Sequence, residues 1–171
     1  IKQLGVEIKC NTEVGKDITI QQLRNEGYKA FYIAIGCSKG NVADVTEDPN
    51  NGIYSALTFL HDYNQGDKKL SGKVVVIGGG NVAIDAARVA KRAGAEQVDM
   101  YSLETEDISP ANKIEIEEAR EDKVNIHFGY GLKAVKTGDH KQVEIIKCTR
   151  VYDENKKFNP RYDMNDVTTV D

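Results

Sequence analysis

The stretch VVVIGGGNVAID at residues 74–85 decides the fold of this chain. Its apolar start, Val74–Ile77, predicts a fully buried parallel strand. The next residues, Gly78–Ala83, fit the pattern G-x-G-x-x-A, and a helical stretch runs from Asn81 to Ala93. A second β-prone run follows at Val98–Tyr101. This order of strand, glycine turn, helix and strand is the one that binding of a dinucleotide pyrophosphate requires.

Each small residue of this fingerprint has a physical role. Gly78 permits the tight turn, Gly80 lets the backbone approach the phosphates, and Ala83 lets the helix pack closely on the strand. The N–H groups and the positive dipole end of the helix then face the anion. We therefore predict a pyrophosphate site formed by Gly78, Gly79, Gly80, Asn81 and Val82. The alternative is a glycine turn that only closes a βαβ unit.

Composition bounds the function. At 171 residues the chain supports one domain, or one domain and a fragment of another. A net charge of −4 without any Lys/Arg block argues against nucleic acid as a partner, and no apolar run approaches a membrane span. Cysteines are scattered and odd in number, which favours a reducing cytoplasm over a disulfide framework or a zinc site. We predict small core or strand roles for Cys10, Cys37 and Cys148.

The residues before the glycine-rich stretch predict a smaller unit. Val6–Cys10 alternates as a strand does, and Lys29–Ile35 has the composition of a buried strand. Between them lies a short helix from Ile20 with a capping box of Thr19 and Gln22, ended by Gly27. The polar loop 37–52 is the clearest linker, so we place a domain boundary at residue 40, giving segments 1–40 and 41–171.

The other elements complete an α/β pattern. We predict an amphipathic helix over Ile53–Tyr63 and another from Pro110 to about Glu121. Val124–Phe128 predicts the third strand of a central parallel sheet. A long strand over Gln142–Asp153 and a turn into Phe158 predict a β-rich segment that crosses one face of that sheet or extends it.

Nothing in the sequence predicts a complete catalytic or metal site. The carboxylates of the helix after Pro110 are expected to form its solvated face: Glu115, Glu117, Glu118, Glu121 and Asp122. His127 lies within a strand and is expected to be a packed, hydrogen-bonded histidine. Tyr152 and Lys156 fit the Tyr-x-x-x-Lys pattern of short-chain dehydrogenases, but they bracket a turn, whereas that chemistry needs them on one helix face. We therefore predict no catalytic residue and no metal site.

Several stretches together resemble a family. The most specific is Gly72–Arg88, and the others follow in family order: Leu4–Ile8, Val14–Thr19, Tyr28–Gly36, Ile114–Ala119 and Asn125–Phe128. Over its whole length the chain resembles part of the glutamate synthase small-subunit type of NAD(P)H:flavin oxidoreductase, which includes the flavin-containing half of dihydropyrimidine dehydrogenase. The resemblance implies a Rossmann-like NAD(P)-binding domain inserted into a FAD-binding domain.

The resemblance also implies that segment 1–40 is a remnant of the FAD domain and that 41–171 is the NAD(P) domain. Three absences from the sequence favour a truncated chain. The sequence has no second glycine-rich fingerprint, no late Gly-Asp motif and no initiator Met. FAD would then belong to the full-length parent only, held by its missing FAD domain. An iron–sulfur subunit or domain would be a further partner, since no cysteine cluster for it is present here.

The residues after the second strand bear on the choice of cofactor. Many NADP-using members of this family carry two arginines there, whereas this chain has Ser102 and Leu103, followed by Glu104. A carboxylate repels a 2′-phosphate and accepts hydrogen bonds from ribose hydroxyls, so we expect NAD(H) to be favoured over NADP(H). Asp85 corresponds to an acidic position near the nicotinamide in related folds. Its alternative role is that of a polar residue stabilised by the helix dipole.

Three functions remain open from the sequence. The first is an NAD(P)H-binding module that delivers hydride to FAD held elsewhere in a parent flavoenzyme, the fragment alone being inactive. The second is a small complete dehydrogenase. The third is a non-catalytic nucleotide-sensing or interaction domain.

Overall fold

The computed structural model describes residues 1–36, 45–46, 48–66, 69–137 and 141–170. It divides into two compact units, Ile1–Cys37 and Ser38–Asp171. The first unit contains a single turn of 3-10 helix, η1 (Lys2–Leu4), and the helix α1 (Ile20–Asn25). The predicted capping box is confirmed: Gln22 N donates to Thr19 Oγ1, and Thr19 N donates to Gln22 Oε1.

The two strands predicted in the first unit are wrong. Residues 6–10 and 29–35 form no strand, and all of them are exposed. A strand requires a neighbour to satisfy its backbone N–H and C=O groups, and within the described part of this unit the one bridge joins Val14 and Ile18. For the same reason Cys10 is an exposed residue, not a core residue.

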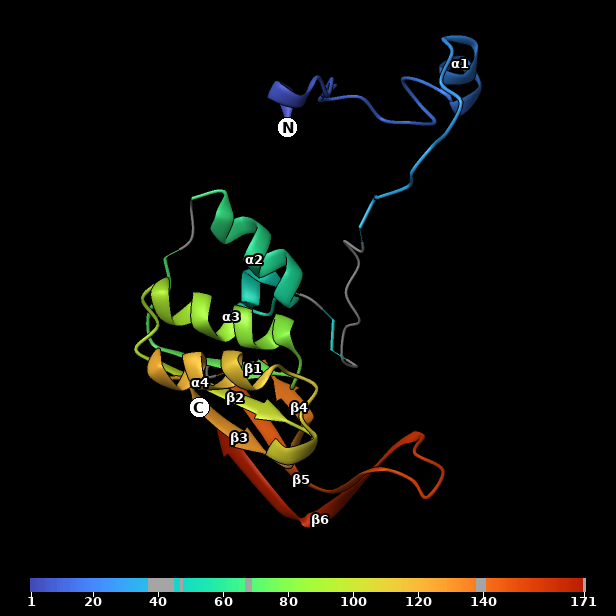
Figure 1. Cartoon of the computed structure of the whole chain (residues 1–171). Coiled ribbons are helices and arrows are strands. Elements are labelled where there is room, and N and C mark those ends of the chain that lie inside the picture. Colours follow the sequence, from blue (N-terminus) through green and yellow to red (C-terminus); the bar gives the residue numbers. More distant parts are fainter. Residues whose placement is uncertain (37–44, 47, 67–68, 138–140, 171) are drawn as a thin grey trace. The chain divides into compact units, whose positions relative to one another are not determined.

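The second unit holds the predicted α/β domain (Figure 1). In chain order its elements are η2 (Pro49–Asn51), α2 (Ala56–Asn64), β1 (Lys73–Ile77), α3 (Asn81–Arg92), β2 (Gln97–Ser102), η3 (Glu106–Ile108), α4 (Lys113–Glu121), β3 (Asn125–Phe128), β4 (Tyr130–Lys136), β5 (Gln142–Tyr152) and β6 (Phe158–Val170). Two of these helices begin after a capping side chain, α2 after Ser55 and α4 after Asn112. Pro110 therefore lies before α4 instead of in its first turn as predicted, because Asn112 supplies the N-cap.

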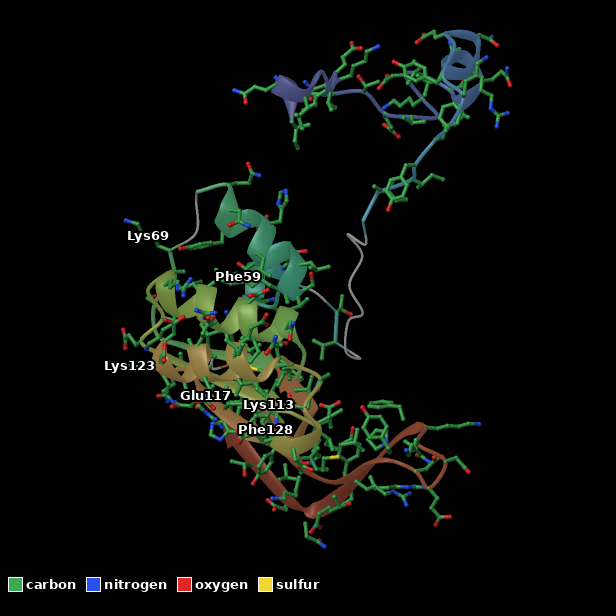
Figure 2. The ribbon with its side chains drawn as sticks, viewed as in Figure 1. Phe59, Lys69, Lys113, Glu117, Lys123 and Phe128 are labelled. Atoms are coloured by element: carbon green, nitrogen blue, oxygen red, sulfur yellow. The ribbon has the colours of Figure 1, made fainter. Side chains whose placement is uncertain are left out.

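A parallel sheet of order β1-β2-β3 confirms the predicted core of the domain. Val98 and Met100 point to its helical face, where they pack with Ile84 of α3 and Ile116 of α4. Phe59 of α2 and Phe128 of β3, labelled in Figure 2, contribute to the same cluster. Because side chains alternate along a strand, Asp99 and Tyr101 point to the opposite face.

The prediction that Val74–Ile77 is fully buried is wrong. Among the described residues β1 pairs with β2 alone, so it is an edge strand, and its residues are half-buried or exposed. An apolar run in the sequence indicates that both faces of a strand are apolar. It does not report whether a second strand flanks it in the plane of the sheet.

The β-rich segment forms its own antiparallel sheet of order β4-β5-β6. It lies against the face of the parallel sheet opposite the helices, which confirms the crossing arrangement, and Figure 1 shows α2 and α3 on one side with β5 and β6 on the other. Tyr130 of β4 contacts Tyr101 of β2 edge-on, with ring centroids 6.3 Å apart. Cys148, predicted to be a small core residue, is buried in β5, while Cys37 lies outside the described residues.

Candidate functional site

The glycine loop Gly78–Gly80 joins β1 to α3 at the carboxyl edge of the parallel sheet. Gly78 N donates to Tyr101 O, which extends the β1–β2 pairing by one residue. Gly78 has φ +140°, where L side chains are strained, and a Cβ there would lie 3.2 Å from Ala83 Cβ. The turn and the close packing of α3 on the sheet therefore both require glycine at this position, as the pattern predicts.

Gly80 has a different reason to be glycine. Its backbone is extended, with φ −92° and ψ 173°, a conformation open to any residue. A Cβ built on Gly80 would meet no described atom within 4 Å. Gly80 is the N-cap of α3, and no described side chain caps that helix end, so its first N–H groups are left without a capping side chain. The arrangement fits an anion such as a pyrophosphate, since both room and donors are present.

Gly79 is glycine for a third reason, which sequence reasoning did not find. A Cβ there would lie 2.1 Å from Ser102 Oγ and 2.9 Å from Glu104 Oε2. Ser102 is fully buried and Glu104 is 9% exposed, and Ser102 Oγ donates to Glu104 Oε2 over 3.0 Å. The end of β2 thus places a buried carboxylate directly beneath the glycine loop.

The segment that follows β2 is fastened to the same loop. Ser109 Oγ donates to Gly79 O over 3.3 Å, and Asn112 N donates to Asn81 Oδ1 over 2.9 Å. Asn81 thus links the start of α3 to the start of α4. Sequence reasoning missed Ser109 and Asn112, because their contacts join residues about thirty positions apart and no local pattern reports them.

The remaining predicted site residues divide into two groups. Val82 and Asp85 are exposed on α3, on the side of the helix away from the sheet. Leu103 is half-buried and packs against Gly131 of β4. The contact is close, because a Cβ added to Gly131 would lie only 2.7 Å from Leu103 Cδ2. Leu103 therefore contacts the antiparallel sheet, while Ser102 and Glu104 contact the glycine loop.

An open cavity of about 800 Å³ adjoins this loop. It lies between the end of β1 and the antiparallel sheet, and its lining includes Ile77, Gly78, Gly79, Tyr101, Glu104 and Tyr130. The glycine loop and the Glu104 carboxylate thus border one concave region, which is the arrangement expected of a site for an organic cofactor.

A polar cluster lies on the face of the parallel sheet away from the helices. The buried Asp99 carboxylate accepts hydrogen bonds from Gln97 Nε2 and Asn125 Nδ2 and pairs with His127 Nε2 at 3.0 Å. Burial raises the pKa of Asp99, but these hydrogen bonds outweigh it and hold the pKa below its ordinary value. His127 also stacks on Tyr101, with ring centroids 4.5 Å apart, so it is the packed histidine that was predicted.

The acidic face of α4 is only partly solvated, contrary to prediction. Arg88 of α3 binds both Glu118 and Asp122, and Arg92 binds Asp122 as well. The hydrogen bond from Arg88 holds the pKa of Asp122 below its usual range. Figure 2 labels Glu117 on the same helix, and this residue binds Arg120. Glu118 and Asp122 thus join α4 and the residue after it to α3.

No group of three His, Cys, Asp or Glu side chains among the described residues is placed to hold a metal ion. Tyr152 ends β5 and Lys156 lies in the following turn, so this pair does not share a helix face. Within the described ranges, no helix is long and apolar enough to span a membrane.

Comparison with known proteins adds an independent finding. Residues 3–158 match the family described as pyridine nucleotide-disulphide oxidoreductase. The NADP(+)-dependent formate dehydrogenase subunit beta of Moorella thermoacetica is 39% identical over 156 residues, covering 88% of this chain and 22% of that protein. The NAD-dependent dihydropyrimidine dehydrogenase subunit PreT of Escherichia coli K12 is 36% identical over 137 residues, covering 79% of this chain and 32% of that protein.

The glutamate synthase [NADPH] small chain of Escherichia coli K12 is 28% identical over 159 residues, covering 86% of this chain and 34% of that protein. The chain thus spans between a fifth and about a third of the length of these relatives. Among solved structures, FprA of Mycobacterium tuberculosis in complex with NADPH matches with a TM-score of 0.70 at 14% identity, covering 94% of this chain and 51% of that one. At that identity the match shows a shared fold.

Proposed function

This chain belongs to the pyridine nucleotide-disulphide oxidoreductase family, and from that premise we propose that it is the NAD(P)H-binding module of a flavin-dependent oxidoreductase of the glutamate synthase small-subunit type. It would deliver hydride to FAD held by polypeptide outside these 171 residues. NAD(P)H supplies the hydride, and the residues described here bind and orient it.

The open space at Gly80 carries this proposal. Nothing in the described protein requires glycine there, since the backbone is ordinary and a Cβ would meet no atom. The N-terminus of α3, which begins after Gly80, has no capping side chain among the described residues. A ligand that needs close backbone approach and carries negative charge explains both features, and a dinucleotide pyrophosphate is such a ligand.

The proposed cofactor-binding residues have separate tasks. Gly78, Gly80, Asn81 and Val82 surround the pyrophosphate through their backbone, and Asn81 is held in place by Asn112. Ser102, Leu103 and Glu104 border the ribose, and Asp85 lies near the nicotinamide. We propose that these residues bind the cofactor and that none of them is catalytic.

We propose that NAD(H) is favoured over NADP(H). The support is the buried Glu104 carboxylate beneath Gly79, which would accept hydrogen bonds from ribose hydroxyls and repel a 2′-phosphate. The names of the relatives do not support this preference: the formate dehydrogenase subunit is NADP(+)-dependent and the glutamate synthase small chain is named with NADPH, whereas PreT is NAD-dependent. Ser102 and Leu103 provide no positive charge for a 2′-phosphate.

Residues 1–36 support the proposed role of a FAD-domain segment. This unit exposes many large apolar side chains, including Tyr32, Ile33 and Ile35. Exposure of contiguous apolar side chains is typical of an interface, and we propose that the FAD domain covers them. Several relatives are named as subunits, and we propose an iron–sulfur subunit or domain as a further electron partner in the cytoplasm.

Titration of the 171-residue chain with NADH, and separately with FAD, tests the proposed function. We expect NADH to bind, and we expect FAD neither to bind nor to be retained on purification. No turnover is expected with NADH and a small-molecule acceptor, because the flavin is absent. A purified chain with stoichiometric flavin absorbance, or one that does not bind NADH or NADPH, would contradict the proposal.

A further inference from the structure

Gly79 has an ordinary backbone conformation but no room for a side chain. Its φ angle is not positive, so a residue with a side chain could adopt this backbone conformation. The obstacle is the end of β2, because a Cβ would approach Ser102 Oγ to 2.1 Å and Ser102 Cβ to 3.0 Å. The middle glycine of the loop is therefore required by Ser102 and Glu104, and neither the turn nor a phosphate explains it.

The Glu104 carboxylate beneath Gly79 keeps capacity for further hydrogen bonds beside the one from Ser102. Glu104 is 9% exposed, and a buried carboxylate loses hydration that hydrogen bonds must replace. Ser102 Oγ provides one such bond, to Oε2. A carboxylate accepts about four hydrogen bonds, so capacity remains for donors that the ligand brings. Ribose hydroxyls are such donors, whereas a 2′-phosphate brings negative charge instead.

We propose that Ser102 and Gly79 are positioning residues for Glu104, and that the three together set the discrimination between a ribose 2′-hydroxyl and a 2′-phosphate. Ser102 holds the carboxylate under the phosphate loop, and Gly79 leaves the space that this arrangement needs. Ser109 holds Gly79 from its carbonyl side, so the loop and the carboxylate keep a fixed spacing. This inference rests on the proposed dinucleotide-binding function.

The first test removes the Ser102 hydroxyl. Ser102→Ala in the 171-residue chain should lower the ratio of NADPH to NADH dissociation constants roughly threefold, less than loss of the carboxylate itself, because the carboxylate remains but loses its orienting donor. Thr105→Ala is the matched control, since Thr105 Oγ1 also donates to a carboxylate two residues later, Asp107, but on the exposed surface. We expect both dissociation constants to be unchanged in this control.

The second test asks whether Ser102 acts through Glu104. In a Glu104→Gln background, Ser102→Ala should have no further effect on the cofactor ratio, which a double-mutant cycle measures. Gly79→Ala should lower the ratio as Ser102→Ala does, because its Cβ displaces the pair. Ser102→Gly added to Gly79→Ala removes both Ser102 atoms that clash, so NADH affinity should recover relative to Gly79→Ala alone.

The outcomes separate the two proposals. If the wild-type chain binds neither cofactor, the proposed function fails and this inference fails with it. If the wild type binds NADH but Ser102→Ala weakens NADH and NADPH equally, only the positioning role is overturned. Persistence of the Ser102→Ala effect on the ratio in the Glu104→Gln background would also overturn it, since the effect would not pass through Glu104.

Discussion

Residues 29–35 and residues 73–77 carry the same kind of apolar run, but only the second is a strand. Lys73–Ile77 pairs with β2 along its full length, whereas the run at 29–35 forms no strand and is exposed. The difference lies in the neighbour, because a strand is stable only where another strand satisfies its backbone groups. An apolar pattern therefore predicts what a segment can become, and the rest of the polypeptide decides whether it does.

The largest effect that follows from this comparison concerns backbone protection. Amide hydrogens of β2, paired on both sides by β1 and β3, should exchange at least about a thousandfold more slowly than those of residues 29–35. Hydrogen–deuterium exchange followed by mass spectrometry of peptides from the two regions measures this ratio. Equal protection would show that the first unit has a partner for its backbone within the chain.

The same comparison explains how far the sequence predicted the structure. The β1–α3–β2 unit, β3 and β5 follow from local patterns, because each is apolar, regular and bounded by glycine or polar turns. β4 was missed, and the predicted β-rich segment included only the first residue of β6, Phe158. Most of β6 is polar and exposed and is held by pairing with β5. That pairing is a property of the sheet and not of the segment.

The candidate site shows the same limit. The tight turn predicted at Gly78 is confirmed by its φ of +140°, because a turn is a local feature. The space at Gly80 is open, and the approach of a phosphate to it stays a prediction. The requirement for Gly79 was not predicted, because it arises from Ser102 and Glu104 at the end of another strand. The position of each predicted site residue is now known, and its contact with a cofactor stays a prediction.

A second prediction tests the polar contacts that join β2 to β3. Asp99→Asn should reduce the free energy of unfolding by about 2 kcal/mol at pH 7, because three donors lose a charged acceptor. The folded-state pKa of Asp99 is lowered, so its contribution is present above the ordinary carboxyl pKa and is lost as the pH falls through the folded value.

Urea unfolding of wild type and Asp99→Asn between pH 7 and pH 3 measures this difference. The two stabilities should converge at the acid end, below about pH 4. A difference that is constant across this range would show that the carboxylate charge does not contribute.

The smallest expected effect concerns the cofactor and is confined to the second unit. Glu104→Ala should relax the preference for NADH over NADPH by roughly five- to tenfold, corresponding to about 1 kcal/mol of lost discrimination. Fluorescence titration of both proteins with both cofactors provides the comparison. If wild type prefers NADPH, or if the substitution leaves the preference unchanged, Glu104 does not select the cofactor.

The central claim is that the open space at Gly80 receives a dinucleotide pyrophosphate, and NADH titration of Gly80→Val tests it most directly. A valine would fill space that no described atom occupies, so the domain should fold while NADH binding is lost. Ser55→Val is the control, because it places valine at the N-cap of α2 and removes that helix's capping bond, yet should leave NADH binding intact. A folded Gly80→Val protein, with the circular dichroism spectrum of the wild type, that still binds NADH with wild-type affinity would contradict the account.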